Sequence, residues 1–341
     1  MSEELVIYLA LKKCRLSCKK KEINLLKPCV RSYSTKSVDN LSPNGGLDPN
    51  FVTGLADGDG SFYITMRKDV SYRLGYSISP EFKIVAGVSP LNFLLLESVK
   101  NFFGGIGTIT KFKNTYSYCV RNKSHLKVIY THFSNYPLQT TKHVHFILWS
   151  RVLNMIENKE HIVESGFVEI LAIKSLFPTG LNVNLKEAFP NVVSIEKPEF
   201  VVNSTPLNGH WVAGFTQADG SFGLSYSKVL KMKLGYTGQA SFRVSQHERD
   251  LIVLNRIKDL LGCGSVRNVS SIKKEWVFSV TKNLETVSSF FKEYPIYGTK
   301  QLDFESFNKG VLILKNKEHL TPEGLMKFKL LVDNINSSRQ F

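Results

Sequence analysis

The chain has 341 residues, 43% hydrophobic and 11% aromatic, which is enough for two domains with cores and too apolar for a disordered protein. Its 44 basic and 29 acidic side chains give a formal charge of +15, so nucleic acid is the leading partner class. No apolar run is long enough to cross a membrane, and five scattered cysteines do not form a disulfide framework.

Residues 1–46 form a basic extension that stands outside the pattern of the remaining chain. The stretch VRSYSTKS at 30–37 resembles the end of a mitochondrial presequence, although Glu3 and Glu4 are unusual in one. The alternative is a tail translated from an upstream exon. Both alternatives predict a mitochondrial protein, either imported or made in the organelle.

From residue 47 the hydrophobic pattern predicts a regular order of elements. Residues 47–58 form an apolar helix that ends at an Asp-Gly pair, and a helix over 90–103 has both a start signal and a terminal glycine. Alternating apolar and polar residues predict strands at 61–68, 76–86, 107–113 and 116–122. Further helices are expected near 124–134 and 141–157. The predicted order is αββαββα.

The chain then repeats itself. FVTGLADGDGSFYI from Phe51 aligns with WVAGFTQADGSFGL from Trp211, 160 positions later. Thr141-Lys142 and Thr299-Lys300 match at a spacing of 158, and NKEH recurs at the same spacing. We therefore predict two copies of one unit, at 47–177 and 210–341, joined by a linker over 178–209 that contains four prolines. Such a chain is a monomer that forms a pseudo-dimer by itself.

The stretch GLADGDGSF at 54–62 begins like a calcium loop, but it departs from the EF-hand pattern. In a loop that starts at Asp57, the glycine of position 6 is replaced by Phe62 and the glutamate of position 12 by Lys68. A loop that starts at Asp59 fails at the same two positions. The two aspartates therefore need another explanation.

The small residues of the motif suggest one. Gly54 and Gly58 lie one helical turn apart, and Gly214 and Ala218 occupy the same places in the second copy. Stripes of small residues allow two helix backbones to approach closely. We therefore expect the two motif helices to pack against each other.

This packing would bring the ends of the two helices, and with them Asp59 and Asp219, to the pseudo-two-fold axis. Two carboxylates held close together repel each other unless a cation lies between them. Oxygen ligands without nearby His or Cys favour Mg²⁺ or Mn²⁺. The pair is thus predicted to be a metal site with one ligand from each copy.

The strands behind each motif have one apolar and one polar face. A solvated sheet surface is the usual explanation of a polar face, but its recurrence in both copies of a basic chain favours a surface that lies along a DNA groove. The side chains expected to contact DNA are Ser61, Tyr63, Thr65, Arg67, Ser77, Ser79, Glu81 and Lys83 in copy one, and Ser221, Ser225, Thr237, Gln239, Ser241, Arg243 and Arg267 in copy two.

The two motifs, VTGLADGDG and VAGFTQADG, resemble the LAGLIDADG signature. The chain is similar to the single-chain, two-motif LAGLIDADG homing endonucleases encoded in organellar group I introns of fungi, over residues 47–341. The resemblance implies an α+β fold in which two saddle-shaped antiparallel sheets straddle double-stranded DNA and the motif helices form the interface. It also implies a staggered double-strand break in a long target, made by metal-dependent hydrolysis that promotes intron mobility.

The resemblance also suggests roles for individual residues. Asp59 and Asp219 match the essential metal ligands, and Gln246 matches a polar residue that orders water in the active site, where copy one has Ala86. Lys142 and Lys300 match the basic residue near the scissile phosphate. The earlier acidic position is Asp57 in copy one and Gln217 in copy two, and we assign it to support or to helix termination.

Two alternatives share this fold. An RNA maturase would assist splicing of its host group I intron by binding RNA with a basic surface, and a DNA-binding regulator would bind without cutting. Neither needs an intact acid at the end of both motifs. The presence of Asp59 and Asp219 therefore favours the nuclease.

Overall fold

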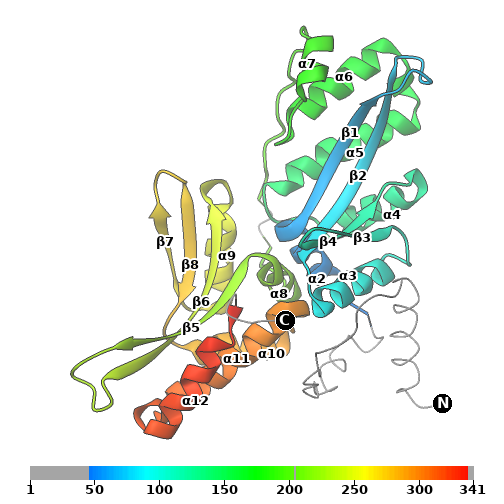
Figure 1. Cartoon of the computed structure of the whole chain (residues 1–341). Coiled ribbons are helices and arrows are strands. Elements are labelled where there is room, and N and C mark those ends of the chain that lie inside the picture. The colour runs from blue at the N-terminus through cyan, green and yellow to red at the C-terminus, as the bar shows by residue number, and fades with distance from the viewer. Residues whose placement is uncertain (1–45, 203–204, 337–341) are drawn as a thin grey trace, which may run out of the picture. The chain divides into compact units, whose positions relative to one another are not determined.

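The computed structural model describes residues 46–202 and 205–336, so all but one residue of the predicted basic extension lies outside the described ranges. The first repeat contains the predicted αββαββα order of elements, followed by one more helix at the place of the helix expected near 141–157 (Figure 1). It consists of α2 (Pro49–Asp59), β1 (Gly60–Lys68), β2 (Tyr76–Gly87), α3 (Pro90–Phe102), β3 (Thr108–Phe112), β4 (Thr115–Val120), α4 (Lys123–Asn135) and α5 (Lys142–Glu157).

The second repeat has the same order with one additional short 3₁₀ helix. Its elements are α8 (Gly209–Asp219), β5 (Gly220–Lys228), β6 (Tyr236–His247), η3 (Glu248–Asp250), α9 (Leu251–Leu261), β7 (Ser265–Ser270), β8 (Glu275–Val280), α10 (Leu284–Glu293) and α11 (Gly298–Lys315). None of the helices in the described ranges is both long and apolar enough to cross a membrane.

Local sequence signals determine where the motif helix α2 begins and ends. Asp48 caps it by accepting a hydrogen bond from the amide of Asn50, and Pro49 supplies a first residue that needs no hydrogen-bond acceptor. After Asp59 the chain turns directly into β1 at Gly60, where a methyl group would lie 2.5 Å from the carbonyl oxygen of Ala56. A glycine is therefore needed for the tight passage from helix to strand.

Each repeat contains a four-stranded antiparallel sheet, in the orders β1-β2-β4-β3 and β5-β6-β8-β7. The apolar face of each sheet packs against helices, with a phenylalanine of the first strand at the centre of the contact. Phe62 contacts the rings of Phe133 on α4 and Trp149 on α5, and Phe222 contacts Phe291 on α10 and Phe307 on α11. The predicted α+β class with two tandem repeats is confirmed.

The residues that follow α5 and α11 form further helices. In the first repeat these are η2 (Glu160–Ile162) and α6 (Glu164–Ser175), and in the second they are η4 (Glu318–Leu320) and α12 (Pro322–Asp333). The segment 178–209, predicted as a linker, contains a short helix, α7 (Val183–Ala188). The ring of Phe189, just after α7, contacts Tyr76 and Phe167, so the beginning of this segment packs against the first repeat.

The two motif helices, α2 and α8, lie side by side (Figure 1), and their backbones are in direct contact. A methyl group on Gly54 would lie 2.0 Å from the carbonyl oxygen of Trp211, and one on Gly214 would lie 2.0 Å from that of Phe51. One turn later, a methyl group on Gly58 would lie 2.2 Å from the Cβ atom of Ala218. No side chain fits between the backbones at these positions.

This contact predicts that Gly54→Ala destabilises the protein. Alanine is about 1 kcal/mol better than glycine in a helix, but here its methyl group meets backbone atoms that cannot move independently, at a cost of about 3 kcal/mol. Chemical denaturation should show a net loss of stability. Gly46→Ala is the control, because a methyl group there meets nothing within 4 Å. Equal stability of the two variants would contradict the close packing.

A buried histidine distinguishes the core of the first repeat from that of the second. The Nε2 atom of His132 lies 3.1 Å from the hydroxyl of Thr53, and its ring packs against Phe103 and Tyr136. At the matching positions the second repeat has Phe290 and Ala213. Burial lowers the pKa of His132 from 6.5 to about 4.

The low pKa predicts an acid-dependent loss of stability. Below pH 6.5 the unfolded chain takes up a proton on His132 that the folded chain excludes, so stability falls as the pH falls toward 4. His132→Phe should remove about 2 kcal/mol of the loss in unfolding free energy between pH 7 and pH 5. Thr53→Ala keeps the imidazole and should keep the loss. Parallel pH curves for the wild type and His132→Phe would refute this assignment.

Candidate active site

The contact between α2 and α8 brings their terminal carboxylates together. Asp59 and Asp219 are the last residues of the two helices, and a methyl group on Gly58 would lie 3.3 Å from Oδ2 of Asp219. Burial, together with repulsion by Asp219, raises the pKa of Asp59 to about 7, against the opposing effect of two lysines. Burial also raises the pKa of Asp219. Both carboxylates thus lie where negative charge is unfavourable without a cation.

The donor set of this pair fits a hard divalent cation. Both side chains offer carboxylate oxygens, and a cation would relieve both their repulsion and their loss of hydration. In the described ranges, no three His, Cys, Asp or Glu side chains are grouped so that they could hold a metal ion. The remaining ligands of such a cation would be other oxygen atoms, from backbone or amide carbonyls, water or a bound substrate.

Two lysines approach the acids, one from each repeat. Lys142 is the first residue of α5, and its Nζ donates to the carbonyl oxygens of Ala56 at 3.0 Å, Gly58 at 2.8 Å and Gly60 at 2.6 Å. These carbonyls lie at the end of α2, where the helix dipole attracts a cation. Burial lowers the pKa of Lys142, while Asp57, Asp219 and Asp59 oppose this effect.

Lys300, from the first turn of α11, makes a similar but sparser contact. Its Nζ donates to the carbonyl oxygen of Gly220 at 2.8 Å, just after α8. An ammonium group has three donors. The three carbonyls use all the donors of Lys142, whereas the described residues give Lys300 one such bond. A new hydrogen-bond acceptor would therefore displace an existing bond of Lys142 but not of Lys300.

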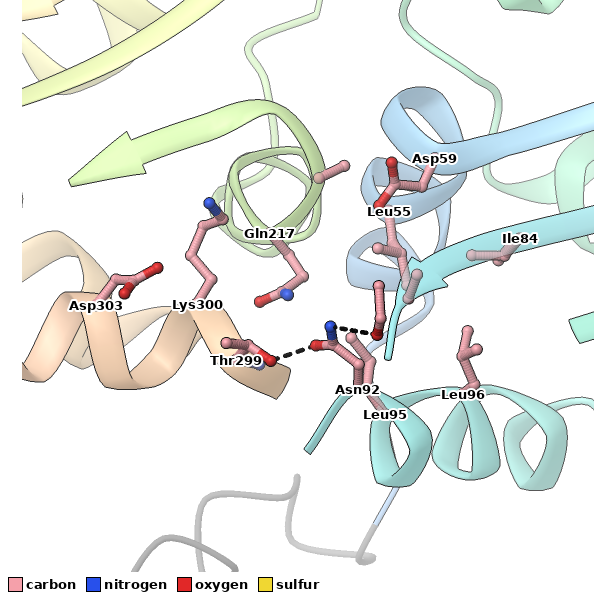
Figure 2. Close-up of a pocket in the computed structure, with 13 residues that line it drawn as sticks. Leu55, Asp59, Ile84, Asn92, Leu95, Leu96, Gln217, Thr299, Lys300 and Asp303 are labelled. Atoms are coloured by element: carbon pink, nitrogen blue, oxygen red, sulfur yellow. Dashed lines mark hydrogen bonds between the residues drawn. The ribbon is translucent and has the colours of Figure 1, made fainter. Parts of the chain in front are cut away.

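The acids also have different neighbours. The Nε2 atom of Gln246 donates to Oδ2 of Asp219 at 2.7 Å, whereas the first repeat has Ala86 at the matching position. Ala86 lines a cavity of about 230 Å³ beside Asp59, together with Gln217 and Lys300 (Figure 2). The amide oxygen of Gln217 is buried and has no hydrogen-bond partner among the described residues. The two acids therefore differ in their surroundings: Gln246 contacts Asp219, whereas a cavity lies beside Asp59.

A family model for the LAGLIDADG endonuclease matches residues 52–153 and 212–311. Each matched segment contains one motif helix with its terminal acid, the sheet behind it and the lysine of the same repeat. The chain belongs to the LAGLIDADG endonuclease family. All the site residues described above lie within the two matched segments.

Relatives of this LAGLIDADG chain occur in fungi. A probable intron-encoded endonuclease of Neurospora crassa is 30% identical over 297 residues, which cover 83% of this chain and 64% of the relative. A mitochondrial protein of Saccharomyces cerevisiae is 25% identical over 321 residues, which cover 85% of this chain and 60% of the relative. The chain spans less than two thirds of the length of both.

Solved structures of a LAGLIDADG homing endonuclease, I-SmaMI, resemble the chain over almost their full length. The structure bound to cleaved DNA is 33% identical, with a TM-score of 0.81 and coverage of 86% of this chain and 98% of I-SmaMI. A second, bound to an uncleaved DNA target in the presence of calcium ions, is 34% identical, with a TM-score of 0.80 and coverage of 85% and 99%.

In this LAGLIDADG chain, the residues that the sequence assigns to DNA contact lie on one face of each sheet. The strand register pairs Ser61 with Lys83 and Thr65 with Ser79 in the first sheet. In the second sheet, Ser221 pairs with Arg243 and Ser225 with Gln239, while Arg267 lies on the outer strand β7 and is exposed. The predicted alternation of apolar and polar faces is therefore present in both repeats.

Glu81 differs from this expectation. The residue is only 2% exposed, and its carboxylate forms ion pairs with Lys83 and Arg121, both at 3.0 Å, and accepts a hydrogen bond from Thr65. Although burial opposes it, these bonds lower the pKa of Glu81. The carboxylate therefore lies on the polar face but is covered by its neighbours and holds two basic side chains, whereas an exposed carboxylate would repel phosphate. The pairing with Arg121, which follows β4, was missed by sequence reasoning.

Asp57 has a different role from Asp59. It is buried and accepts hydrogen bonds from the backbone amide of Gln139 at 2.8 Å, from the backbone amide and hydroxyl of Thr140 at 3.2 and 2.6 Å, and from the Trp211 indole at 2.8 Å. Burial raises the pKa of Asp57 to about 6, against these bonds. The helix continues beyond it to Asp59, so Asp57 does not terminate α2. Through these bonds Asp57 links Trp211 on α8 to Gln139 and Thr140 in the loop that precedes α5.

This arrangement predicts that Asp57→Ala is strongly destabilising. The variant leaves four buried donors without their acceptor, which should lower the free energy of unfolding by about 3 kcal/mol at pH 8. The matched control is Gln217→Ala in the second repeat, for which we expect about 1 kcal/mol. Urea denaturation of both variants measures the difference. If Asp57→Ala lowers the free energy of unfolding no more than Gln217→Ala does, Asp57 does not stabilise the contact between α8 and the loop before α5.

Proposed function

We propose that the chain is a site-specific homing endonuclease that makes a staggered double-strand break in a long DNA target by metal-dependent hydrolysis. The observation that carries this proposal is the placement of Asp59 and Asp219 in one buried pair that two lysines approach. The likeness to I-SmaMI, whose structures contain DNA, supports the same conclusion. A purely RNA-binding protein would have no use for a destabilising pair of buried carboxylates.

Each residue of the site has a chemical role in this proposal. A divalent cation such as Mg²⁺ or Mn²⁺, held by Asp59 and Asp219, would supply Lewis-acid stabilisation of the phosphoryl oxygens and would acidify water. Lys142 and Lys300 place positive charge where negative charge builds up in the transition state. Gln246 donates to Asp219 through its amide nitrogen, and its amide oxygen is the group that would orient a water molecule.

The asymmetry of the site suggests that the two DNA strands are cut at different rates. Lys142 uses its three donors on carbonyl oxygens and must release one of them before it contacts a phosphate. Lys300 donates to one carbonyl oxygen and has further donors for a phosphate. The open cavity beside Asp59 and the Gln246 contact of Asp219 add a second difference. Strand-specific rates are therefore the measurement that reports on each half of the site.

The polar faces of the two sheets are the proposed DNA-contacting surfaces. They carry basic and hydrogen-bonding side chains, which suits contact with base edges and phosphates in a groove. Both acids come from one polypeptide, so the proposed enzyme acts as a monomer. The intron-encoded and mitochondrial relatives, together with the basic extension, support a mitochondrial location and a function in intron mobility.

The decisive test uses duplex DNA that spans the uninterrupted insertion site of the protein's own gene, with Mg²⁺. We expect double-strand cleavage by the wild type, and a loss of at least about a hundredfold in rate for Asp59→Asn and for Asp219→Asn. Gel-shift assays should show that DNA binding is retained. Asp259→Asn, at an exposed acid on α9, is the control and should cut normally.

Two outcomes would overturn the proposal. One is the absence of any cut by the wild type, and the other is undiminished cleavage by the double variant of Asp59 and Asp219. A splicing assay on the host intron, with and without protein, would then test the maturase alternative.

A further inference from the structure

The helix that carries each active-site lysine is held at its N-terminus by a side chain from the other repeat. In the first repeat, the amide of Thr141 donates to Oδ1 of Asp250 at 2.7 Å, and the Thr141 hydroxyl donates to Oδ2 at 3.2 Å. Thr141 immediately precedes α5 and Lys142, whereas Asp250 ends η3 in the second repeat. Asp250 is only 4% exposed.

The opposite half contains the reciprocal contact. The amide of Thr299 donates to Oδ1 of Asn92 at 2.9 Å, as Figure 2 shows. Asn92 lies on α3 of the first repeat, and its Nδ2 donates to the Gly87 carbonyl at 3.0 Å, which fixes the orientation of the amide. Asn92 and Asp250 are 158 positions apart, the same spacing as Thr141 and Thr299.

The N-cap residues of the two lysine-bearing helices, Thr141 and Tyr297, make no side-chain capping hydrogen bond. In α5 the Thr140 hydroxyl accepts from the Lys142 amide at 3.2 Å. The amides of Thr141 and Thr299 are instead bound by Asp250 and Asn92 of the other repeat. In each case the capped threonine is followed directly by the lysine. The first helical turn is thus fixed one residue away from the lysine that it presents.

The position of this turn determines where the ammonium group lies. The three carbonyls that Lys142 contacts all belong to the end of α2 and its passage into β1, and the single carbonyl at Lys300 holds the matching place after α8. A loss of the cap would release the backbone of the first turn and displace Nζ relative to the acids. A displacement of about 1 Å is enough to slow a reaction that depends on positioning.

We propose that Asp250 positions Lys142 and Asn92 positions Lys300, so that each repeat sets the active-site lysine of the other. This inference rests on the proposed role of the two lysines in DNA cleavage. Asp250 and Asn92 are positioning residues, because Asp250 binds the amide and hydroxyl of Thr141 and Asn92 binds the amide of Thr299, and in the described part of the chain neither is hydrogen-bonded to Asp59 or Asp219. The negative charge of Asp250 also acts on Lys142 and Asp219, and Asp250→Asn removes this charge while it keeps an acceptor for the Thr141 amide.

The test follows cleavage of each strand separately, with a different label on the 5′ end of each strand of the duplex. Lys142→Ala and Lys300→Ala first identify the strand that each lysine serves. Asp250→Ala should then slow cleavage of the Lys142-dependent strand about tenfold, and leave the other strand within about twofold. Asn92→Ala should show the reverse preference, so that nicked intermediates of opposite polarity accumulate.

Conservative exchanges distinguish positioning from general stability. Asp250→Asn gives Thr141 the same type of cap that Asn92 gives Thr299. This variant should cleave at a rate within about threefold of the wild type. Asp259→Ala removes an exposed acid from the neighbouring helix and should change neither strand. Thermal unfolding of every variant shows whether a slower rate reflects a smaller folded fraction.

The outcomes separate two failures. If Lys142→Ala and Lys300→Ala do not slow cleavage of either strand, the proposed role of the lysines is wrong, and the positioning inference falls with it. If the lysine variants act on separate strands while Asp250→Ala slows both strands equally, or neither, only the positioning inference is overturned. Asp250→Asn decides the same question if Asp250→Ala does not fold.

Discussion

Direct contact between the backbones of α2 and α8 is the constraint on which the rest of the molecule depends. Gly54 and Gly214 remove the side chains that would hold the helices apart, and Gly58 meets Ala218 one turn later. Because the helices touch along this stripe, their last residues, Asp59 and Asp219, share one site. Larger residues in the stripe would separate the acids and leave each half with a single isolated carboxylate.

The close contact also lets each motif helix reach into the opposite repeat. The indole of Trp211 on α8 donates to Asp57, while the ring of Phe51 on α2 packs edge-on against Tyr297 at 4.8 Å. Buried negative charge is the cost of this geometry, and the surrounding groups offset it unequally. Asp57 has four hydrogen-bond donors, Asp219 has Gln246, and Asp59 lies beside a cavity.

The sequence predicts those features that depend on local pattern or on duplication. The apolar run that ends at an Asp-Gly pair gives the motif helix, alternation around Phe62 and Phe82 gives paired strands, and the repeated motif places two acids at two equivalent helix ends. The short helix α7 was missed because it lies in a proline-containing segment and covers little more than one turn. The buried Glu81 pairs with Arg121, which follows a strand distant in sequence, β4, and no local pattern indicates this contact. The matched spacing of Asn92 and Asp250 was present in the sequence, but only the fold shows that both face a threonine of the other repeat.

The reciprocal caps limit how freely the two halves of such a chain can be exchanged. A repeat moved into a new pseudo-dimer brings its own lysine but leaves behind the side chain that held it, and it presents its own cap to a different helix. Modularity therefore does not coincide with the boundaries of the duplicated unit. The units that must be inherited or engineered together are the pairs Thr141 with Asp250 and Thr299 with Asn92, each of which is divided between the two repeats.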